Sequence, residues 1–573
     1  MARVYDRFLK QRLSRRRMLA ATGGTALGAA GIALVGCGDD GGNGNGPDGN
    51  LTPAADETPT TEGILRQSQT SPYPSLSPFG PTSLASSGIF GFTAYDHFWY
   101  TPIDTGEPEL MLAENIEMVD PEGLETIITM KEAFYHDKPP VDGRQVLSSD
   151  VNPSWERFRD DPFGLGREWM RNVWSGMETP DDLTVIIRQS EPFAFMFGTA
   201  AAGSAFSSSI LPVETLDEDL FDLSRDVIGS GRFLLDSHNN GENLKFRRHP
   251  NWRIPGEPFL AGIDYVLITE AAAARAQFRA GNLDSVGLPN KIEADQMKSD
   301  LGDDIIITSD LSRSYNVLML KMTPPFDDER VRRAIHLAVD RDELIALVEI
   351  DAAGGVPSGI VQPALERDAL SQDEYAEEYF RSDSQEARAM LEDAGFPFDQ
   401  TYTLKYPSPG DATADRALVL QEQLGRAGVN VRLEPQDLLT VWLPNTLNQG
   451  DFDMTLFTHL PYEDAYLPLA FYSDSSPIGP LDDARGRNNM GFFDDEYIAA
   501  FHDIVRTLDT EERTQKIHDA QRMLINKWPP MINLYSSVSF GARWHWYKGI
   551  VSGRGSFGLF NGRAWIDTAL RGS

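Results

Sequence analysis

The chain has 573 residues, of which 41% are hydrophobic and 24% charged, an ordinary composition for a globular protein. A single hydrophobic core rarely grows beyond about 300 residues, so two or more lobes are expected. The formal net charge of −35 argues against nucleic-acid binding through a broad basic surface, because phosphate contacts need clustered Lys and Arg. The single cysteine, Cys37, excludes an intramolecular disulfide and zinc sites built from paired cysteines.

The first 36 residues have the organisation of an export signal. Basic residues come first, and the segment Ser14–Leu19 contains Arg15 and Arg16, which resemble the pair of a twin-arginine signal. The uncharged stretch Met18–Gly36 follows, and it ends in Leu-Val-Gly before Cys37, which resembles a lipobox. The lipobox resemblance implies cleavage before Cys37 and a diacylglyceryl group on its thiol.

A transmembrane helix is the alternative for the uncharged stretch, whose length is close to the minimum for spanning a bilayer. Several glycines in that stretch lower its hydrophobicity and its helix propensity. Residues 37–62 are rich in Gly, Asn, Asp, Pro and Thr without hydrophobic periodicity, so a flexible tether is expected. Removal of residues 1–36 takes away seven basic residues and one acidic residue, which changes the net charge from −35 to −41. The expected mature protein is an acidic body held by lipid on the outer face of the cell membrane.

Beyond residue 63, segments of strand and helix character alternate. Strands are predicted from apolar and β-branched runs at 125–130, 265–268, 429–433 and 452–457. Helices are predicted at 270–280, 327–348, 414–427, 438–447, 494–508 and 510–527. The second of these is either one helix or two helices with a break near Asp340. Asp383 and Glu386 have the spacing of a capping box, which predicts the start of a further helix. This order indicates an α/β lobe with partly parallel strands.

Motifs for catalysis or cofactor binding are weak. Gly553–Gly558 matches the dinucleotide fingerprint by letter, but it lies 15 residues from the C-terminus, so no βαβ unit can follow it. The nine histidines show no spacing typical of a metal site. We therefore expect no enzyme activity, no metal and no cofactor. A surface-anchored hydrolase is the alternative, because 86 carboxylates always include some pair that looks like an acid–base dyad.

Several segments of the chain match, in order, the sequence motifs of one known protein family. Pro324–Arg341 reads Pro-Pro-Phe-Asp-Asp-Glu-Arg-Val-Arg-Arg-Ala-Ile and ends in Ala-Val-Asp-Arg. Ile228–Phe233 resembles a Gly-Thr-Gly-Pro-Tyr turn, and Arg248–Trp252 resembles Arg-Asn-Pro-x-Tyr-Trp. Further blocks are Thr126–Asp137, Ser149–Phe158, Ala276–Asp284, Leu391–Phe396, Gln423–Val431 and Pro529–Ile532. The ordered set resembles the extracellular solute-binding proteins of family 5, the peptide and nickel group of ABC importers.

The resemblance spans about residues 63–550 and implies an α/β fold of the periplasmic-binding-protein type, class II. Two lobes would be joined by hinge strands, with a ligand cleft between them. The resemblance implies a first lobe of residues 63–315 and 528–573, and a second lobe of residues 316–527. The ligand would contact both lobes only in the closed form, so binding would shift the population towards closure.

The resemblance also implies which residues contact the ligand. The first crossing between the lobes is expected near Tyr315 and Asn316. In peptide binders of the family, an Asp-Tyr pair after the Phe-Asp strand supplies the carboxylate for the peptide amine. The corresponding segment here reads Tyr462-Glu463-Asp464, with the acids after the tyrosine. Either acid would suit a cationic ligand, and an exposed acidic turn is the alternative.

Two tryptophans, Trp442 and Trp544, are further candidates for an aromatic wall beside the ligand, with burial in a core as the alternative. The function implied is that of a lipid-anchored substrate-binding component of an ABC importer, which binds an oligopeptide or a similar small polar solute. The implied partners are permease subunits with a separate ATPase, and the chain is expected to act as a monomer without nucleic acid. A non-transport sensor or chaperone with the same fold is a second alternative to transport.

Overall fold

The computed structural model describes residues 58–70, 72–80, 89–91, 93–100, 109–161, 168–198, 208–350, 354–376, 378–408, 411–479, 486–550 and 562–572. The predicted export signal with Arg15 and Arg16, the lipidation site Cys37 and the turn at 553–558 lie outside these residues. The last residues of the expected tether are described, and the hydroxyl of Thr60 donates to the carbonyl of Ile566 at 2.5 Å.

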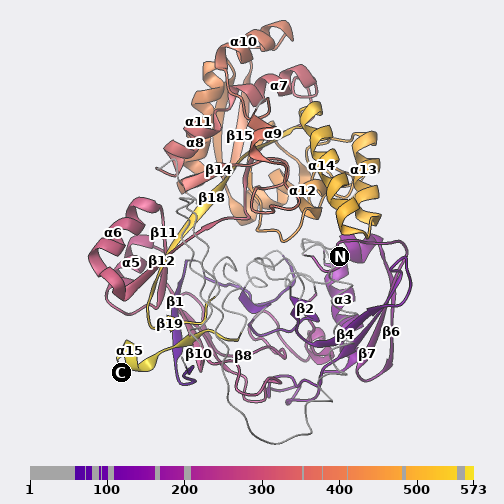
Figure 1. Ribbon diagram of the computed structural model, residues 1–573, viewed down its shortest axis with the longest axis vertical. Helices are drawn as coiled ribbons and strands as arrows, with labels where there is room; N and C mark the ends of the chain where they lie inside the picture. Colours follow the sequence, from indigo (N-terminus) through magenta and orange to yellow (C-terminus); the bar gives the residue numbers. More distant parts are fainter. Residues whose placement is uncertain are drawn as a thin grey trace, which may run out of the picture.

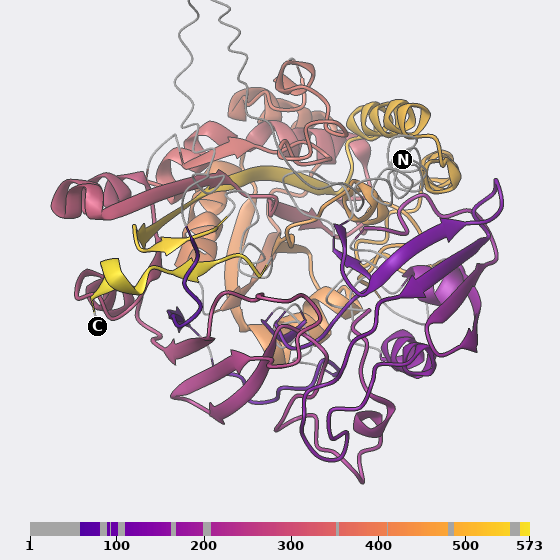
Figure 2. The same cartoon turned by 60° about the horizontal axis from the view of Figure 1, so that its bottom comes forward.

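Two four-stranded sheets dominate the lower body in Figure 1, which holds most of the N-terminal half. The first sheet has the order β1 (Ile64–Gln69), β10 (Gly262–Leu267), β9 (Asn243–Arg248), β8 (Phe233–Asn239). The second has the order β4 (Ala113–Met118), β5 (Glu125–Met130), β7 (Thr184–Gln189), β6 (Trp174–Asp181). Shorter elements are β2 (Trp99–Tyr100), β3 (Glu109–Leu110), α3 (Val151–Asp160) and α4 (Glu168–Asn172). Figure 2 shows the two sheets on different sides of this body.

One eight-stranded sheet organises the upper body and continues into the left side of Figure 1. Its main path is β11 (Ser285–Leu288), β18 (Met531–Trp544), β13 (Asn316–Leu320), β17 (Met454–Thr458), β15 (Thr401–Ser408), β16 (Asn430–Asp437). The strands β12 (Ile305–Leu311) and β14 (Gly355–Pro357) also pair with β18. Because β15 is parallel to both β16 and β17, the predicted α/β lobe with partly parallel strands is confirmed.

Helices alternate with these strands along the chain. They are α5 (Ala271–Arg279), α6 (Lys291–Leu301), α7 (Glu329–Ala338), α8 (Arg341–Val348), α9 (Gln372–Ala376), α10 (Ser384–Asp393), α11 (Asp411–Arg426), a π-helix at Leu438–Leu447, α12 (Tyr466–Ala470), α13 (Asp495–Arg506) and α14 (Thr510–Lys527). The C-terminal part adds β19 (Tyr547–Lys548), β20 (Trp565–Ile566) and α15 (Thr568–Arg571).

The caps explain two of the helix starts. The stretch 327–348 forms two helices, because the Asp340 carboxylate accepts a hydrogen bond from the backbone N–H of Glu343 and thereby starts α8. Asp383 accepts hydrogen bonds from the backbone N–H groups of Gln385 and Glu386, as the capping pattern predicted for α10. The other predicted strands and helices are confirmed with ends shifted by a few residues, while most of the remaining strands, among them β15 and β18, were not predicted.

Strand β18 joins the parts of the molecule. Its first half pairs with β13, and Ile532 packs in one core with Leu318 of that strand. Its second half pairs with β11 and β12, and Trp544 packs in a separate small core with Phe278. The predicted lobe boundaries fall at the start of β13 and shortly before β18, and the division into residues 63–315, 316–527 and 528–573 stays a prediction.

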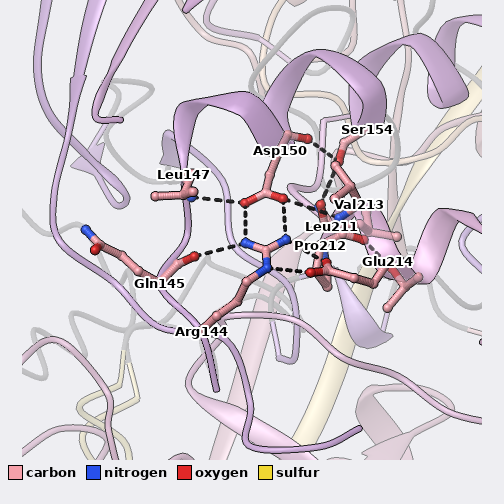
Figure 3. A network of polar contacts seen from close by, with 10 residues as sticks. Arg144, Gln145, Leu147, Asp150, Ser154, Leu211, Pro212, Val213 and Glu214 are labelled. Carbon is pink, nitrogen blue, oxygen red and sulfur yellow. Dashed lines mark hydrogen bonds and ion pairs between the residues drawn. The ribbon is translucent and has the colours of Figure 1, made fainter. Parts of the chain in front are cut away.

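The lower body contains a guanidinium that is fully paired (Figure 3). Arg144 donates to both carboxylate oxygens of Asp150, at 2.9 and 2.6 Å, and to both carboxylate oxygens of Glu214, at 2.7 and 2.6 Å. Asp150 also accepts hydrogen bonds from the backbone N–H groups of Leu147 and Val213. These contacts tie the start of α3 to the segment that follows residue 211.

Candidate functional site

The pairing of β13 with β17 brings several of the predicted ligand residues together. The backbone N–H of His459, just after β17, donates to the carbonyl of Tyr315, just before β13, at 2.9 Å. The two rings stack with their centroids 4.2 Å apart. His459 Nδ1 lies 3.2 Å from the hydroxyl of Tyr462, and the ring of Phe457 lies 4.6 Å from the imidazole. Tyr315, Phe457, His459 and Tyr462 therefore form one group, which we call the aromatic cluster.

The two residues predicted at the lobe crossing differ in what their side chains offer. The hydroxyl of Tyr315 is buried, and no hydrogen-bond partner for it lies among the described residues. Burial raises the pKa of Tyr315 well above its usual value. Asn316, by contrast, donates to the carbonyl of Tyr535 at 3.2 Å and accepts from the hydroxyl of Thr458 at 2.8 Å. Its amide therefore holds three neighbouring strands together.

Glu463 presents a carboxylate with an unmet hydrogen-bonding need. Its Oε2 is buried without a hydrogen-bond partner in the described part of the chain. Burial, followed by the neighbouring charge of Asp464, raises the pKa of Glu463 to about 8, while its own backbone N–H and the charge of Arg313 act in the opposite direction. A positively charged group that donates hydrogen bonds would supply the missing partner of Oε2 and would also offset the free-energy cost of burying the negative charge.

Asp464 lies beside Glu463 in a more mixed environment. One of its carboxylate oxygens accepts a hydrogen bond from the backbone N–H of Tyr466 at 2.9 Å. Burial, with a smaller contribution from the charge of Asp368, raises its pKa to about 6, although the charges of Arg367 and Arg513 oppose the shift. Two neighbouring acids with raised pKa values are a typical sign of a functional site.

The segment after β7 brings the lower body against the acids. A Cβ atom on Gly198 would lie only 1.7 Å from the Oδ2 of Asp464, so any side chain at this position would displace the carboxylate. This close approach joins residues that are far apart in the sequence.

The same segment packs on helices α12 and α13 of the upper body. The backbone N–H of Ala194 donates to the carbonyl of Val505 at 2.7 Å. The rings of Phe193 and Phe195 lie 5.3 and 5.5 Å from the ring of Tyr466. The two bodies therefore touch directly beside Asp464.

The structure places the two candidate tryptophans in different surroundings. Trp442, on the π-helix, donates from its indole N–H to the hydroxyl of Thr455 at 3.0 Å, and its ring stacks on Phe457 of the aromatic cluster at 6.0 Å. Trp544 lies in the small core beside α5, where its indole N–H donates to the carbonyl of Phe278 at 3.2 Å. Of the predicted residues, Trp544 is thus the one placed apart from the cluster.

Sequence reasoning missed Gly198, Arg313, Arg367 and Arg513, which surround the two acids. No local spacing marks these residues, because each reaches the site from a distant segment. Among the described residues, no three His, Cys, Asp or Glu side chains are grouped so that they could hold a metal ion. In the same part of the chain, no helix is long and apolar enough to cross a membrane.

The fold and the acids at the contact between two bodies define a two-lobed binding protein of the periplasmic type. Residues 107–477 match the family described as bacterial extracellular solute-binding proteins, family 5 middle. The chain belongs to this family, which confirms the resemblance seen in the sequence.

Individual relatives are distant. The chain is 24% identical over 336 residues to the periplasmic oligopeptide-binding protein OppA of Escherichia coli, which covers 55% of this chain and 60% of OppA. It is 22% identical over 451 residues to the glutathione-binding protein GsiB of Salmonella typhimurium, which covers 74% of this chain and 80% of GsiB. The matches span 41% of the OppA of Haemophilus influenzae and 61% of AppA of Bacillus subtilis.

Solved structures share the fold over most of the chain. The oligopeptide-binding protein AppA of Bacillus subtilis, in complex with a nonapeptide, has a TM-score of 0.71 at 20% identity and covers 89% of this chain and 100% of AppA. The periplasmic binding protein DppA of Helicobacter pylori, in complex with the peptide STSA, has a TM-score of 0.72 at 20% identity and covers 88% of this chain and 98% of DppA. The two-lobed α/β fold predicted from the sequence is thereby confirmed.

Proposed function

We propose that this protein is the substrate-binding component of an ABC importer, held by a lipid on Cys37 at the outer face of the cell membrane. It takes an oligopeptide or a similar small polar solute between its lobes and delivers it to the permease, while a separate ATPase drives transport. The family and the peptide complexes of AppA and DppA support this proposal. The chain itself acts as a monomer and carries out no catalysis.

The observation that carries the proposal is the buried carboxylate oxygen of Glu463, which has no partner among the described residues and is adjacent in sequence to Asp464 at the contact between the two bodies. A carboxylate in such a place lowers the stability of the protein unless a donor reaches it. The ammonium group of a peptide, or another cationic group of a solute, supplies three N–H donors and a positive charge. We assign this role to Glu463 with Asp464 beside it, and we assign Tyr315, Tyr462 and Trp442 to the wall around the ligand.

Binding works through lobe closure. The contact of Gly198 with Asp464, and the hydrogen bond from Ala194 to Val505, exist only while the two bodies are together. A solute that touches both bodies has a higher affinity for the closed form, so it shifts the population towards that form. Closure also excludes water, which strengthens the polar contacts to the ligand. The lobes in this scheme are residues 63–315 with 528–573, and residues 316–527.

The ligand proposal is tested with the unlipidated protein of residues 38–573. Thermal unfolding and native mass spectrometry are measured with peptide and sugar libraries, and we expect peptides with a free amine to raise the melting temperature. A ligand at 100 times its Kd stabilises the protein by about 2.7 kcal/mol. Glu463→Gln should weaken binding, while Glu374→Gln, which removes a surface ion pair with Arg522, should not. The absence of any ligand together with the absence of permease binding would overturn the proposal.

The anchor is tested separately in cells. Cys37→Ala removes the only thiol, so we expect the variant to be released into the medium while the unaltered protein stays with the membrane fraction. Retention of the variant at the membrane would contradict lipidation at Cys37. A Ser14→Ala variant, altered in the same segment without loss of the thiol or of either arginine, should stay with the membrane fraction.

A further inference from the structure

Arg232, just before β8, carries a guanidinium that forms no ion pair or hydrogen bond with the described residues. The residue is only 8% exposed, and its Nε is buried without a hydrogen-bond partner. Its contact is with the indole ring of Trp252, whose centroid lies 5.3 Å from the guanidinium carbon. Burial lowers the pKa of Arg232 to about 10, so the side chain is still cationic at neutral pH.

A second guanidinium lies on the same indole. The guanidinium carbon of Arg253 lies 4.0 Å from the centroid of Trp252, so the ring contacts two cations. Arg253 forms a buried ion pair with Asp96, whose carboxylate is 0% exposed. Asp96 is therefore paired with Arg253, and the charges of Asp96 and Glu257 act on Arg232 without forming an ion pair with it. The Nε of Arg253 and the indole N–H of Trp252 are also buried and unpartnered in the described structure.

Glu257 is the other acid whose charge acts on Arg232, and it is paired with a different arginine. Glu257 pairs with the guanidinium of Arg563 at 3.6 Å. A Cβ atom on Gly562 would lie 2.9 Å from the Glu257 carboxylate and 3.2 Å from the Nε of Arg232, so the glycine backbone stands beside both groups. Among the described residues, no carboxylate forms an ion pair with Arg232, since Asp96 and Glu257 pair with Arg253 and Arg563. The group keeps an excess of positive charge and of buried donors.

We propose that Arg232, Trp252 and Arg253 form a binding site for an anionic group, a carboxylate or a phosphate, carried by the solute. A buried charge without a partner is costly, and an anion that binds there removes this cost. The fork of N–H groups on a guanidinium fits the paired oxygens of a carboxylate or phosphate. Assignment of the anion to the transported solute rests on the proposed function, whereas the site itself rests only on these side chains.

Two further observations support the assignment. The turn that Ile228–Phe233 resembles has proline at the position of Arg232, so the charge is a departure of this chain from that pattern. A short path of contacts also leads from this site to the acids. Trp99, three residues after Asp96, packs on Phe197 with the ring centroids 4.9 Å apart, and the next residue is Gly198, which touches Asp464.

The test compares two buried arginines in the unlipidated protein. Melting temperatures are measured with sodium succinate, with inorganic phosphate and with sodium chloride at equal ionic strength. We expect succinate or phosphate to raise the melting temperature of the unaltered protein above its value in chloride. Arg232→Met should abolish this response, and its melting temperature in chloride should equal or exceed that of the unaltered protein, because the variant removes an unpaired charge.

Arg332 provides the matched control. It is 4% exposed, and it donates to the backbone carbonyls of Trp528, Phe326, Asp327 and Lys527. Arg332→Met should therefore lower the melting temperature and keep the response to the anion. If Arg232→Met does not fold, Arg232→Lys, which keeps the charge but loses the fork, should weaken anion binding about tenfold.

The outcomes separate the two proposals. A response to succinate alone assigns a carboxylate to the site, and a response to phosphate alone assigns a phosphate group. If neither anion stabilises the unaltered protein, or if Arg232→Met unfolds earlier than the unaltered protein and keeps the anion response, the anion site is wrong. If the site behaves as expected while no solute from the libraries binds and no permease is bound, the site stands and the importer function fails.

Discussion

Arg144 and Arg232 lie in the same body of the protein and differ in how their charges are met. The guanidinium of Arg144 makes four hydrogen bonds to the carboxylates of Asp150 and Glu214, whereas that of Arg232 lies over the ring of Trp252 and forms no ion pair with a described residue. The two carboxylates raise the pKa of Arg144, whereas burial lowers that of Arg232. A charge that the chain satisfies itself serves the fold, and a buried charge left unsatisfied indicates a partner from outside.

The largest effect is expected from breaking the satisfied pair. Arg144→Met leaves the carboxylate of Asp150, which is 1% exposed, without its counterion, so we expect a loss of about 3 kcal/mol of unfolding free energy. Urea unfolding of the unlipidated protein measures the loss. Arg232→Met, measured alongside, should lose nothing without an anion, and an equal loss in both variants would remove the contrast between the two sites.

Glu463 is the acidic counterpart of Arg232, because its buried carboxylate also lacks a hydrogen-bond partner at one oxygen among the described residues. The pKa of Glu463 is about 8 in the folded protein and 4.5 in its ordinary state. Between pH 4.5 and pH 8, the folded protein therefore keeps a proton on Glu463 that the unfolded chain has lost. Stability without ligand should therefore fall as the pH rises from about 5 to about 8. Glu463→Gln should remove this fall and stabilise the protein at pH 8 by about 2 kcal/mol, once partial exposure is allowed for.

The check is urea unfolding at several pH values between 4 and 9. Asp464→Asn serves as the control, because the pKa of Asp464 is raised to about 6 and its contribution should end at a lower pH. If Glu463→Gln has the same pH dependence as the unaltered protein, the carboxylate is already satisfied and its assigned role in ligand binding is wrong.

A smaller effect is expected from the contact that brings the acids against the lower body. Gly198→Ala places a methyl group where the carboxylate of Asp464 lies, so the closed form should be disfavoured and solute affinity should fall about tenfold. Isothermal titration with the best ligand measures the change. Gly176→Ala, whose added Cβ would meet nothing within 4 Å, should bind as the unaltered protein does, and equal affinities in both variants would contradict the closure scheme.

The smallest effect belongs to a charge pair on the surface. Arg506 and Glu191 form an ion pair between α13 and the segment after β7 at 2.5 Å, but both side chains are partly exposed. Glu191→Gln should change the free energy of solute binding by about 0.5 kcal/mol, and less at high salt. Titration at two salt concentrations measures it, and a loss as large as that of Gly198→Ala would mean that this pair, rather than close packing, holds the bodies together.

The local parts of the fold could be predicted from the sequence. Asp340 and Asp383 cap helices because the geometry of a helix start depends only on neighbouring residues. The family resemblance named Tyr315 and Tyr462 separately as candidate ligand contacts, whereas the pairing of β13 with β17, which brings both against His459, was not predicted.

The remaining features depend on segments that are distant in the sequence. Nothing local shows that Gly198 touches Asp464, or that Asp96 is already used by Arg253. The single local sign of the anion site was the arginine at the proline position of a turn, and its meaning depends on which groups surround it in the fold. Trp544 shows the same point, because its place in a separate core follows from the second half of β18.

The central claim is that the two bodies enclose a solute whose cationic group pairs with Glu463. Native mass spectrometry of the protein purified under mild conditions from cells that produce it tests this most directly, with Glu463→Gln purified in parallel. We expect a bound small molecule with a cationic group, present on the unaltered protein and reduced on the variant. An unaltered protein that carries no small molecule and gains no stability from any peptide or sugar in the libraries would contradict the claim.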